Sequence, residues 1–273
     1  MPLSNFQVTR TRSIEEIRDA LAHVYIKPAL QPVGATKTLD AMISHCRLND
    51  VSLGYVKYGA SVRAEFPTFD RFIYMTRLWG KGRITSRNAT ATLDADRGAL
   101  ISPGDGYRAD YDEDSMRMVV QFDARALTAK LAALIGRPVD EPLCMDLQAE
   151  LTDSGSKALR DYLSALVNTL SSVDRPLPHW WVAQTEQLLM ILYLVGHRHN
   201  YSRFLGRSPP DAGVSLVRRT EEYIEANWRE SPSLETLAEV SGVSAFSLYR
   251  TFKSRRGYSP FEFAARIRSR HKE

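Results

Sequence analysis

The chain has 273 residues, of which 44% are hydrophobic and 25% charged, a composition that supports one large or two modest globular domains and excludes a low-complexity protein. Its 36 basic side chains nearly balance its 32 acidic ones, so the net charge of +4 by itself favours no class of partner. The N-terminus lacks an apolar signal segment, the apolar run 188–195 is too short to span a bilayer, and Cys46 and Cys144 are the only cysteines, so we expect a cytoplasmic protein without a membrane partner.

Residues 52–122 are predicted to form short strands separated by turns. The segments 52–59 and 71–79 are rich in aromatic and β-branched residues, and Pro-Gly-Asp-Gly at 103–106 marks a turn. Residues 116–122 alternate, with Met116, Met118, Val120 and Phe122 on one side, which predicts a half-buried strand. Many short strands that follow one another closely in the sequence indicate a β-sandwich or β-barrel.

Helical spacing begins after Asp123. Three helices are predicted, over 124–136, 156–172 and 179–205, and the first ends at Gly136. The third helix is apolar nearly all round, with a stripe of Leu188, Leu192 and Val195. Either it packs on the barrel with one face and on a second copy of the chain with the other, or it lies wholly within the core of one chain. The composition of residues 206–213 is that of a linker.

The residues beyond this linker are predicted to be helical and basic. From residue 244 onward there are eight basic and two acidic side chains, a local excess that suits a polyanion such as nucleic acid. Ser233 and Ser244 are predicted N-caps, and Ser259 with Glu262 has the spacing of a capping box, with Pro260 at the first helical position. Two short helices joined by a turn at Gly242, the second of them basic, predict a helix-turn-helix.

The outward face of the second helix is the predicted DNA-binding surface. At 100° per residue Leu248 and Phe252 mark its buried side, while Phe246, Arg250 and Lys253 lie opposite. A guanidinium at Arg250 suits guanine O6 and N7 in the major groove, and Lys253 suits a phosphate. The candidate DNA-binding residues are Phe246, Ser247, Tyr249, Arg250 and Lys253.

Residues 233–270 resemble the first helix-turn-helix of AraC-type transcription regulators, followed by the start of the helix that links it to a second one. The shared features are Leu237-Ala238, Gly242-Val243-Ser244, Leu248, Arg250-Thr251-Phe252-Lys253, Gly257 and Ser259-Pro260. Residues 6 to about 205 are similar, more loosely, to the cupin-like effector-binding domain that precedes this motif in many members. The resemblance implies an α+β protein: a cupin-like β-barrel with packed helices at 1–150, a helical dimerisation segment at 151–205, a linker at 206–213, and an all-α helix-turn-helix domain at 214–273.

The sequence departs from this family at its end. Such regulators carry two helix-turn-helix units, and the sequence stops inside the connecting helix, so we expect the second unit to be missing and sequence-specific DNA binding to be weakened.

Catalysis is not expected of the barrel. None of the six histidines lies between residues 52 and 122, and the two imidazoles of His197 and His199 would lie 200° apart on a helix, so no metal site or other cofactor is predicted. Nucleotide-binding and hydrolase motifs are absent from the sequence. Strand aromatic residues with Arg77 and Arg83 either line an effector pocket or are core and surface; the aromatic residues are Tyr55, Tyr58, Phe72, Tyr74, Trp79 and Tyr107.

The sequence therefore predicts an effector-responsive, sequence-specific DNA-binding regulator of AraC type, and we expect an activator. Its expected partners are double-stranded promoter DNA, a small-molecule effector of unknown identity, a second copy of the chain and RNA polymerase. The alternative is an effector-binding, dimerising protein without effective DNA binding, which acts by titrating partners.

Overall fold

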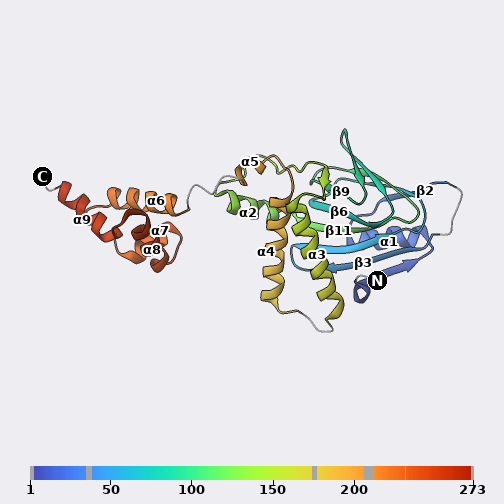
Figure 1. Cartoon of the computed structure of the whole chain (residues 1–273), viewed down its shortest axis with the longest axis horizontal. Helices are drawn as coiled ribbons and strands as arrows, with labels where there is room; N and C mark the ends of the chain where they lie inside the picture. The colour runs from blue at the N-terminus through green and yellow to red at the C-terminus, as the bar shows by residue number, and fades with distance from the viewer. Residues whose placement is uncertain (1–2, 35–38, 174–176, 206–211, 231, 272–273) are drawn as a thin grey trace. The chain divides into compact units, whose positions relative to one another are not determined.

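Two antiparallel β-sheets form most of the N-terminal part of the chain (Figure 1). The computed structural model describes residues 3–34, 39–173, 177–205, 212–230 and 232–271. The chain divides into two compact units, residues 1–204 and 205–273. Each unit has its own hydrophobic core, and each is described by itself.

The larger sheet of the first unit has seven strands with β11 near its middle. Strand β11 (Met116–Asp123) pairs with β4 (Val51–Lys57) on one side and with β6 (Arg71–Trp79) on the other. Beyond β4 lie β3 (Ala41–Arg47) and β1 (Gln7–Thr11), and beyond β6 lie β9 (Arg97–Ile101) and β12 (Gln148–Glu150). The short strands rich in aromatic and β-branched residues are present as the sequence predicted, but only β3 and β4 are neighbours joined by a short turn, and the other neighbours in this sheet are distant in the chain.

The smaller sheet has five strands and faces the larger one. Its order is β2 (Ala29–Pro32), β5 (Val62–Phe66), β10 (Tyr107–Tyr111), β7 (Gly82–Ser86) and β8 (Ala89–Leu93). Buried side chains from both sheets form one core between them, and Ile17 and Leu21 of helix α1 (Ile14–Val24) belong to it. This is the predicted cupin-like β-barrel, and the α+β fold class is confirmed.

Helices cover the opposite face of the seven-stranded sheet. Helix α3 (Ser154–Ser172) lies beside α4 (His179–Gly196), and α2 (Ala124–Ile135) contacts α4 near the end of β11 (Figure 1). Tyr193 of α4 packs on Phe122 of β11, with ring centroids 4.5 Å apart. A Cβ atom built on Gly196 would lie 2.8 Å from the backbone of Gly155, so glycine at both positions permits the close approach of α3 and α4.

Two local predictions were wrong. Strand β11 is buried on both faces instead of half-buried, because the five-stranded sheet covers the face that carries Arg117, Val119 and Gln121. The helix predicted over 179–205 ends at Gly196, and a short helix, α5 (Ser202–Leu205), follows. The intervening residues are held by side chains: the His197 ring bonds the Tyr193 carbonyl at 2.9 Å, and the His199 ring bonds the Leu194 carbonyl at 3.1 Å.

The second unit consists of four short helices around a small core. They are α6 (Ala212–Ala226), α7 (Leu234–Ser241), α8 (Ala245–Arg256) and α9 (Pro260–Arg270). Leu216, Leu237 and Leu248 are among the core residues, one each from α6, α7 and α8. The predicted linker 206–213 lies mainly outside the described residues, and its last two residues begin α6. None of the helices in the described part of the chain is long and apolar enough to cross a membrane.

Candidate functional sites

The turn between α7 and α8 is built by local side-chain chemistry. The Ser233 hydroxyl accepts the Thr236 N–H at 3.1 Å and begins α7, and the Ser244 hydroxyl accepts the Ser247 N–H at 3.2 Å and begins α8. Between them Gly242 ends α7 with φ of 69°, a left-handed conformation that side chains other than glycine adopt at a cost. The predicted caps are present, and a short turn at Gly242 joins α7 to α8.

Helix α8 is anchored on one side. Leu248 and Phe252 are fully buried, as predicted, and Phe252 lies about 6 Å from the rings of Tyr258 and Phe263. At the end of α8, Arg256 makes two hydrogen bonds to the Glu221 carboxylate of α6, at 2.8 and 2.7 Å. Arg256 therefore has a structural partner, although the sequence shows it only as one of a run of cations.

The opposite side of α8 is exposed and carries two cation–aromatic pairs. Phe246 is 73% exposed, and the Arg250 guanidinium lies 5.8 Å from its ring centroid. Three residues further along, the Lys253 ammonium lies 5.8 Å from the centroid of the Tyr249 ring. Each pair is four residues apart on the helix, and contacts of this geometry contribute about 0.5–1 kcal/mol at exposed sites. The aromatic rings thus hold the two cations on the outward face.

This face carries two cations that are not held in close ion pairs. In the described part of the chain, neither Arg250 nor Lys253 forms an ion pair with an acidic side chain. Ser247 is half-buried and its hydroxyl accepts a hydrogen bond from the Ser244 hydroxyl at 2.9 Å, so it lies at the edge of the face. The structure brings the five candidate DNA-binding residues together on one side of α8, with Phe246 projecting furthest. Two donors and an exposed ring have the chemistry needed at a DNA groove.

The strand aromatic residues of the first unit do not line one pocket. Phe72 and Tyr74 face the helices and contact Tyr193, whereas Tyr58 and Tyr107 lie between the two sheets. Trp79 is 44% exposed, and Arg83 is exposed on β7. Side chains alternate along a strand, so residues one position apart in the sequence lie on opposite faces of the sheet.

The cation inside the barrel is Arg117, which sequence reasoning missed. It is 2% exposed, and its guanidinium lies 3.7 Å from the Tyr111 ring centroid and 4.6 Å from that of Tyr58. Burial of a cation costs several kcal/mol, whereas each desolvated cation–aromatic contact contributes about 2 kcal/mol. The two rings therefore offset only part of the cost. The signal in the sequence was an arginine on the side of β11 opposite to its methionines.

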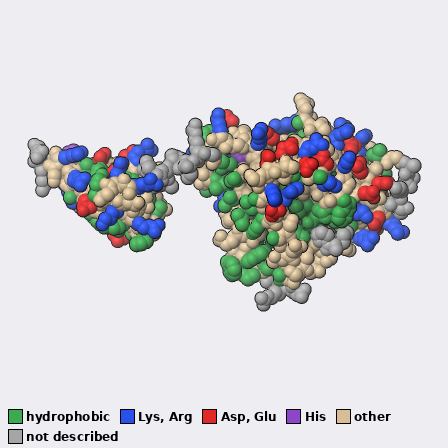
Figure 2. Space-filling model, viewed as in Figure 1, with side chains coloured by type: hydrophobic (Ala, Val, Ile, Leu, Met, Phe, Trp, Pro, Cys, Tyr) green, Lys and Arg blue, Asp and Glu red, His purple; other side chains and the backbone are tan. Residues whose placement is uncertain are grey.

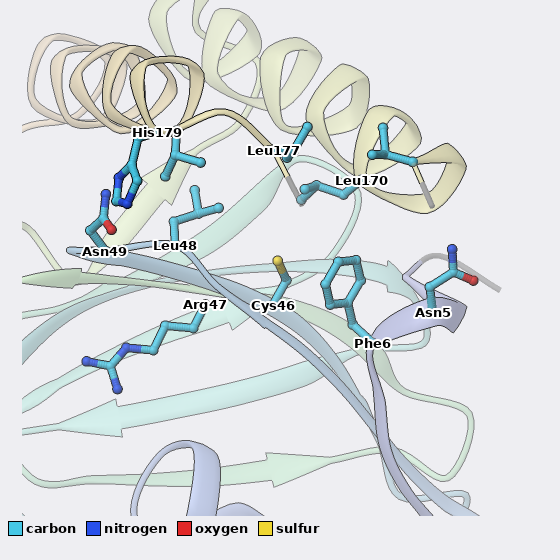
Figure 3. Close-up of a pocket in the computed structure, with 11 residues that line it drawn as sticks. Asn5, Phe6, Cys46, Arg47, Leu48, Asn49, Leu170, Leu177 and His179 are labelled. Atoms are coloured by element: carbon cyan, nitrogen blue, oxygen red, sulfur yellow. The ribbon is translucent and has the colours of Figure 1, made fainter. Parts of the chain in front are cut away.

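A hollow of the first unit lies between the end of β3 and the α3–α4 pair (Figure 3). Its volume is about 580 Å³, and Figure 3 shows Phe6, Cys46 and Leu48 on the sheet side, below Leu170 and Leu177. His179 reaches from α4 toward Asn49, whereas Arg47 points away from the helices. The lining is mainly apolar, and of the polar residues labelled in Figure 3, Asn49 and His179 lie at one end and Asn5 at the other.

In the described residues, no group of three His, Cys, Asp or Glu side chains is placed to hold a metal ion. The structure also changes the geometry that the sequence suggested for His197 and His199. They follow α4 in extended backbone instead of lying on a helix, and each is buried with a ring nitrogen bonded to a backbone carbonyl.

Comparison with known proteins gives one family and several distant relatives. The family model described as AraC-binding-like domain matches residues 17–194. The probable thc operon regulatory protein of Rhodococcus erythropolis is 23% identical over 258 residues, covering 90% of this chain and 76% of that protein. XylDLEGF operon transcriptional activator 3 of Pseudomonas putida is 24% identical over 237 residues, covering 86% and 68%. The structure of the AraC-like transcriptional activator CuxR has a similar fold, with a TM-score of 0.53 and 12% identity over 96% of this chain and 93% of that one.

Proposed function

We propose that this chain, which belongs to the AraC-binding-like domain family, is a cytoplasmic transcription regulator that binds specific DNA through α8 and responds to a small-molecule effector. The relatives above carry names of operon regulators and activators, which supports an activator that acts with RNA polymerase at a promoter. The single observation that carries the proposal is the outward face of α8, where Arg250 and Lys253 are exposed beside Phe246.

The chemistry of this face suits both parts of DNA recognition. Arg250 supplies a planar fork of donors that matches the two acceptors on the guanine edge, and the exposed Phe246 ring can contact a thymine methyl group. Lys253 supplies a point charge for a phosphate. Arg256 is held by Glu221, so it orients the helix instead of binding DNA.

We also propose that the first unit forms a homodimer through α4. Leu189, Met190 and Tyr193 of α4 face the sheet and are buried, whereas Leu188 is 40% and Val195 59% exposed. Figure 2 shows hydrophobic side chains gathered over the α3–α4 pair. An exposed apolar stripe on an otherwise packed helix is typical of a protein–protein contact. Sedimentation velocity of the full chain tests this, since Leu188→Glu should shift a dimer toward monomer, whereas Gln31→Glu at an exposed position of β2 in the five-stranded sheet should not.

We propose further that the chain is not an enzyme. Among the described residues, the ionisable groups of the barrel interior include two arginines, His45 and several tyrosines; burial raises the pKa of Tyr107 well above its ordinary value and lowers the pKa of His45 to about 4, so this imidazole is neutral near pH 7. An arginine stays protonated and such a tyrosine stays neutral near pH 7, so neither residue type exchanges protons readily there.

Fluorescence anisotropy of the purified chain tests DNA binding. The DNA upstream of its own gene is compared with a scrambled sequence of the same length, from low to physiological salt. Arg250→Ala should abolish the preference for the upstream DNA, while Arg218→Ala, which removes the same charge from exposed α6, should retain it. Equal binding to both DNAs that disappears at physiological salt would favour the alternative, a dimerising protein that titrates its partners.

A further inference from the structure

We propose that the barrel interior is the binding site of a small hydrophobic carboxylate whose anionic group pairs with Arg117. This inference rests on the proposed effector response, and it assigns that effector a chemical class. The first observation is the missing countercharge: no acidic side chain in the described part of the chain forms an ion pair with Arg117, and its buried Nη1 has no hydrogen-bond partner there. Buried charges in proteins are generally paired, and a guanidinium matches a carboxylate in a bidentate geometry.

The neighbouring strand adds positive charge where a partner would be expected. Arg117 stands opposite Arg77 of β6 in the register of the sheet, and like charges placed directly opposite destabilise a sheet. Arg77 is half-buried, its Nη1 donates to the Gly80 carbonyl at 3.4 Å, and its buried Nε has no partner among the described residues. A bound anion would supply a countercharge on this face of the sheet.

A route connects Arg117 with the surface. Arg117 lines an inner cavity that also reaches Tyr25 and Gln121, and these two residues line the two pockets at the mouth of the barrel, of about 450 and 390 Å³. Gln121 is four residues from Arg117 on β11, about 13 Å along the strand. A ligand of this length can therefore enter at the mouth and place its anionic end at Arg117.

The lining indicates the rest of the ligand. Between Arg117 and Gln121 the cavity is bordered by apolar side chains, which favour a hydrocarbon or aromatic body; they are Leu21, Ile26, Val56, Phe66, Ile73, Met75, Tyr107 and Val119. At the mouth the charged lining residues are Arg47, Arg71 and a single acid, Asp70, which favours entry of an anion.

Binding requires a side chain to move. The inner cavity has a volume of about 20 Å³, room for about one water molecule. Tyr25 is the side chain that we expect to move, because it lines the inner cavity and both pockets at the mouth. Its buried hydroxyl has no hydrogen-bond partner in the described structure and lies against Gly54, where a Cβ would come within 2.7 Å of that oxygen. Tyr25 also contacts the His45 ring edge-on, with centroids 5.2 Å apart, so displacement of Tyr25 would be felt by β3.

The first test needs no ligand. Val56 lies directly opposite Arg117 on β4 and lines the same cavity, so Val56→Glu would place a carboxylate beside the guanidinium and Val56→Gln is its uncharged match. If Arg117 lacks a countercharge, the Glu variant should melt several degrees above the Gln variant at pH 7. A Glu variant that melts below the Gln variant would show that the tyrosine rings already satisfy Arg117, and the proposal would be wrong.

The second test is calorimetric titration of the full chain with 4-phenylbutyrate and octanoate, each against its primary amide. The wild type should bind a carboxylate about tenfold or more tightly than the amide, since charge-assisted hydrogen bonds carry the difference. Arg117→Met should remove that preference, and Arg83→Met on the exposed face of β7 should keep it. If Arg117→Met does not fold, the two Val56 variants replace it in this titration. Val56→Glu should prevent binding of the carboxylate ligand, and Val56→Gln should not.

Any one of three results would overturn the inference: the wild type binds neither carboxylate, it binds acid and amide equally, or the Arg117→Met variant keeps the preference for the acid over the amide. The effector response is tested in a separate experiment, which measures binding to the upstream DNA by fluorescence anisotropy with and without the carboxylate. A carboxylate that binds through Arg117 but leaves DNA binding unchanged supports the site and contradicts the effector response, whereas loss of DNA binding with an intact site contradicts only the function.

Discussion

The Glu186 carboxylate of α4 accepts the backbone N–H of Val51 at 2.8 Å, joining a helix to the start of a strand 135 residues earlier in the chain. The same oxygen accepts the N–H groups of Asn49 and Asp50, and the other oxygen accepts the Asn49 side-chain amide at 2.9 Å. Glu186 is 3% exposed. This carboxylate therefore satisfies the turn between β3 and β4 and fixes α4, with its exposed apolar stripe, against the barrel.

Glu186→Gln should destabilise the first unit by about 1.5–3 kcal/mol, because the charge that strengthens these hydrogen bonds is lost and the new amide NH2 replaces the oxygen that accepts from the Asn49 side-chain amide. Urea unfolding followed by circular dichroism measures the change. Gln184→Ala, on the exposed side of α4, should change the free energy of unfolding by no more than about 0.5 kcal/mol. Equal stability of the Gln variant and the wild type would contradict the structural role of this carboxylate.

His45 should make the fold sensitive to acid. Burial, with the nearby charges of Arg47 and Arg71, lowers its pKa from 6.5 to about 4. Between these values the unfolded chain takes up a proton that the folded chain excludes, so stability that is present above pH 6.5 is lost as the pH falls through 4. The expected contribution is on the order of 2 kcal/mol.

The measurement is urea unfolding of the wild type and His45→Gln at pH 7 and pH 4. The variant should lose less stability over this range. Burial also lowers the pKa of His197 and His199, but both residues remain in both proteins, so the difference isolates His45. An identical loss in the two proteins would show that His45 titrates normally.

Phe246 and Phe252, both on α8, should respond in opposite ways to replacement by alanine. Phe246→Ala removes an exposed ring, so it should leave the melting temperature nearly unchanged and weaken binding to upstream DNA, partly by freeing Arg250. Phe252→Ala empties a fully buried position and should cost about 3–5 kcal/mol of stability. Thermal melts and anisotropy on both variants check this; a destabilised Phe246 variant would place that ring in the core.

Replacement of Gly242 should be limited by the backbone conformation at this position and not by the room available for a side chain. A Cβ there would meet nothing within 4 Å, but φ is 69°. Gly242→Ala should cost about 1–2 kcal/mol, and Gly242→Asn less, because asparagine adopts the left-handed region more readily. Thermal unfolding of the second unit within the full chain measures both. Alanine at least as stable as asparagine would contradict this account of the turn.

Much of the second unit could be predicted because its signals are local. Ser233, Ser244 and Ser259 cap helices whose first turns follow at once, and Gly242 and Gly257 end helices by a backbone preference of their own. The outward face of α8 follows from helix geometry once Leu248 and Phe252 are known to be buried. The role of Arg256 did not follow, since its partner Glu221 lies on another helix.

In the first unit the strands and their turns could also be predicted from the sequence, but which side chains are buried could not. Alternation along β11 predicted one exposed face, and only the five-stranded sheet lying over that face shows why Arg117 is buried there. The apolar run of α4 gave no end point, because the chain leaves the helix at Gly196 through contacts of His197 and His199 with backbone carbonyls and through close packing on Gly155.

The sequence by itself thus determined the order of elements, the helix caps and the cationic face of α8, all of which depend on residues a few positions apart. Only the tertiary structure decided that Glu186 holds the turn before Val51. It also decided that Arg117 lies between Tyr58 and Tyr111, with no acidic partner among the residues that the structure describes. The physical reason is that burial and charge pairing depend on which segments the sheet order brings together, and strand pairing joins residues that are far apart in the chain.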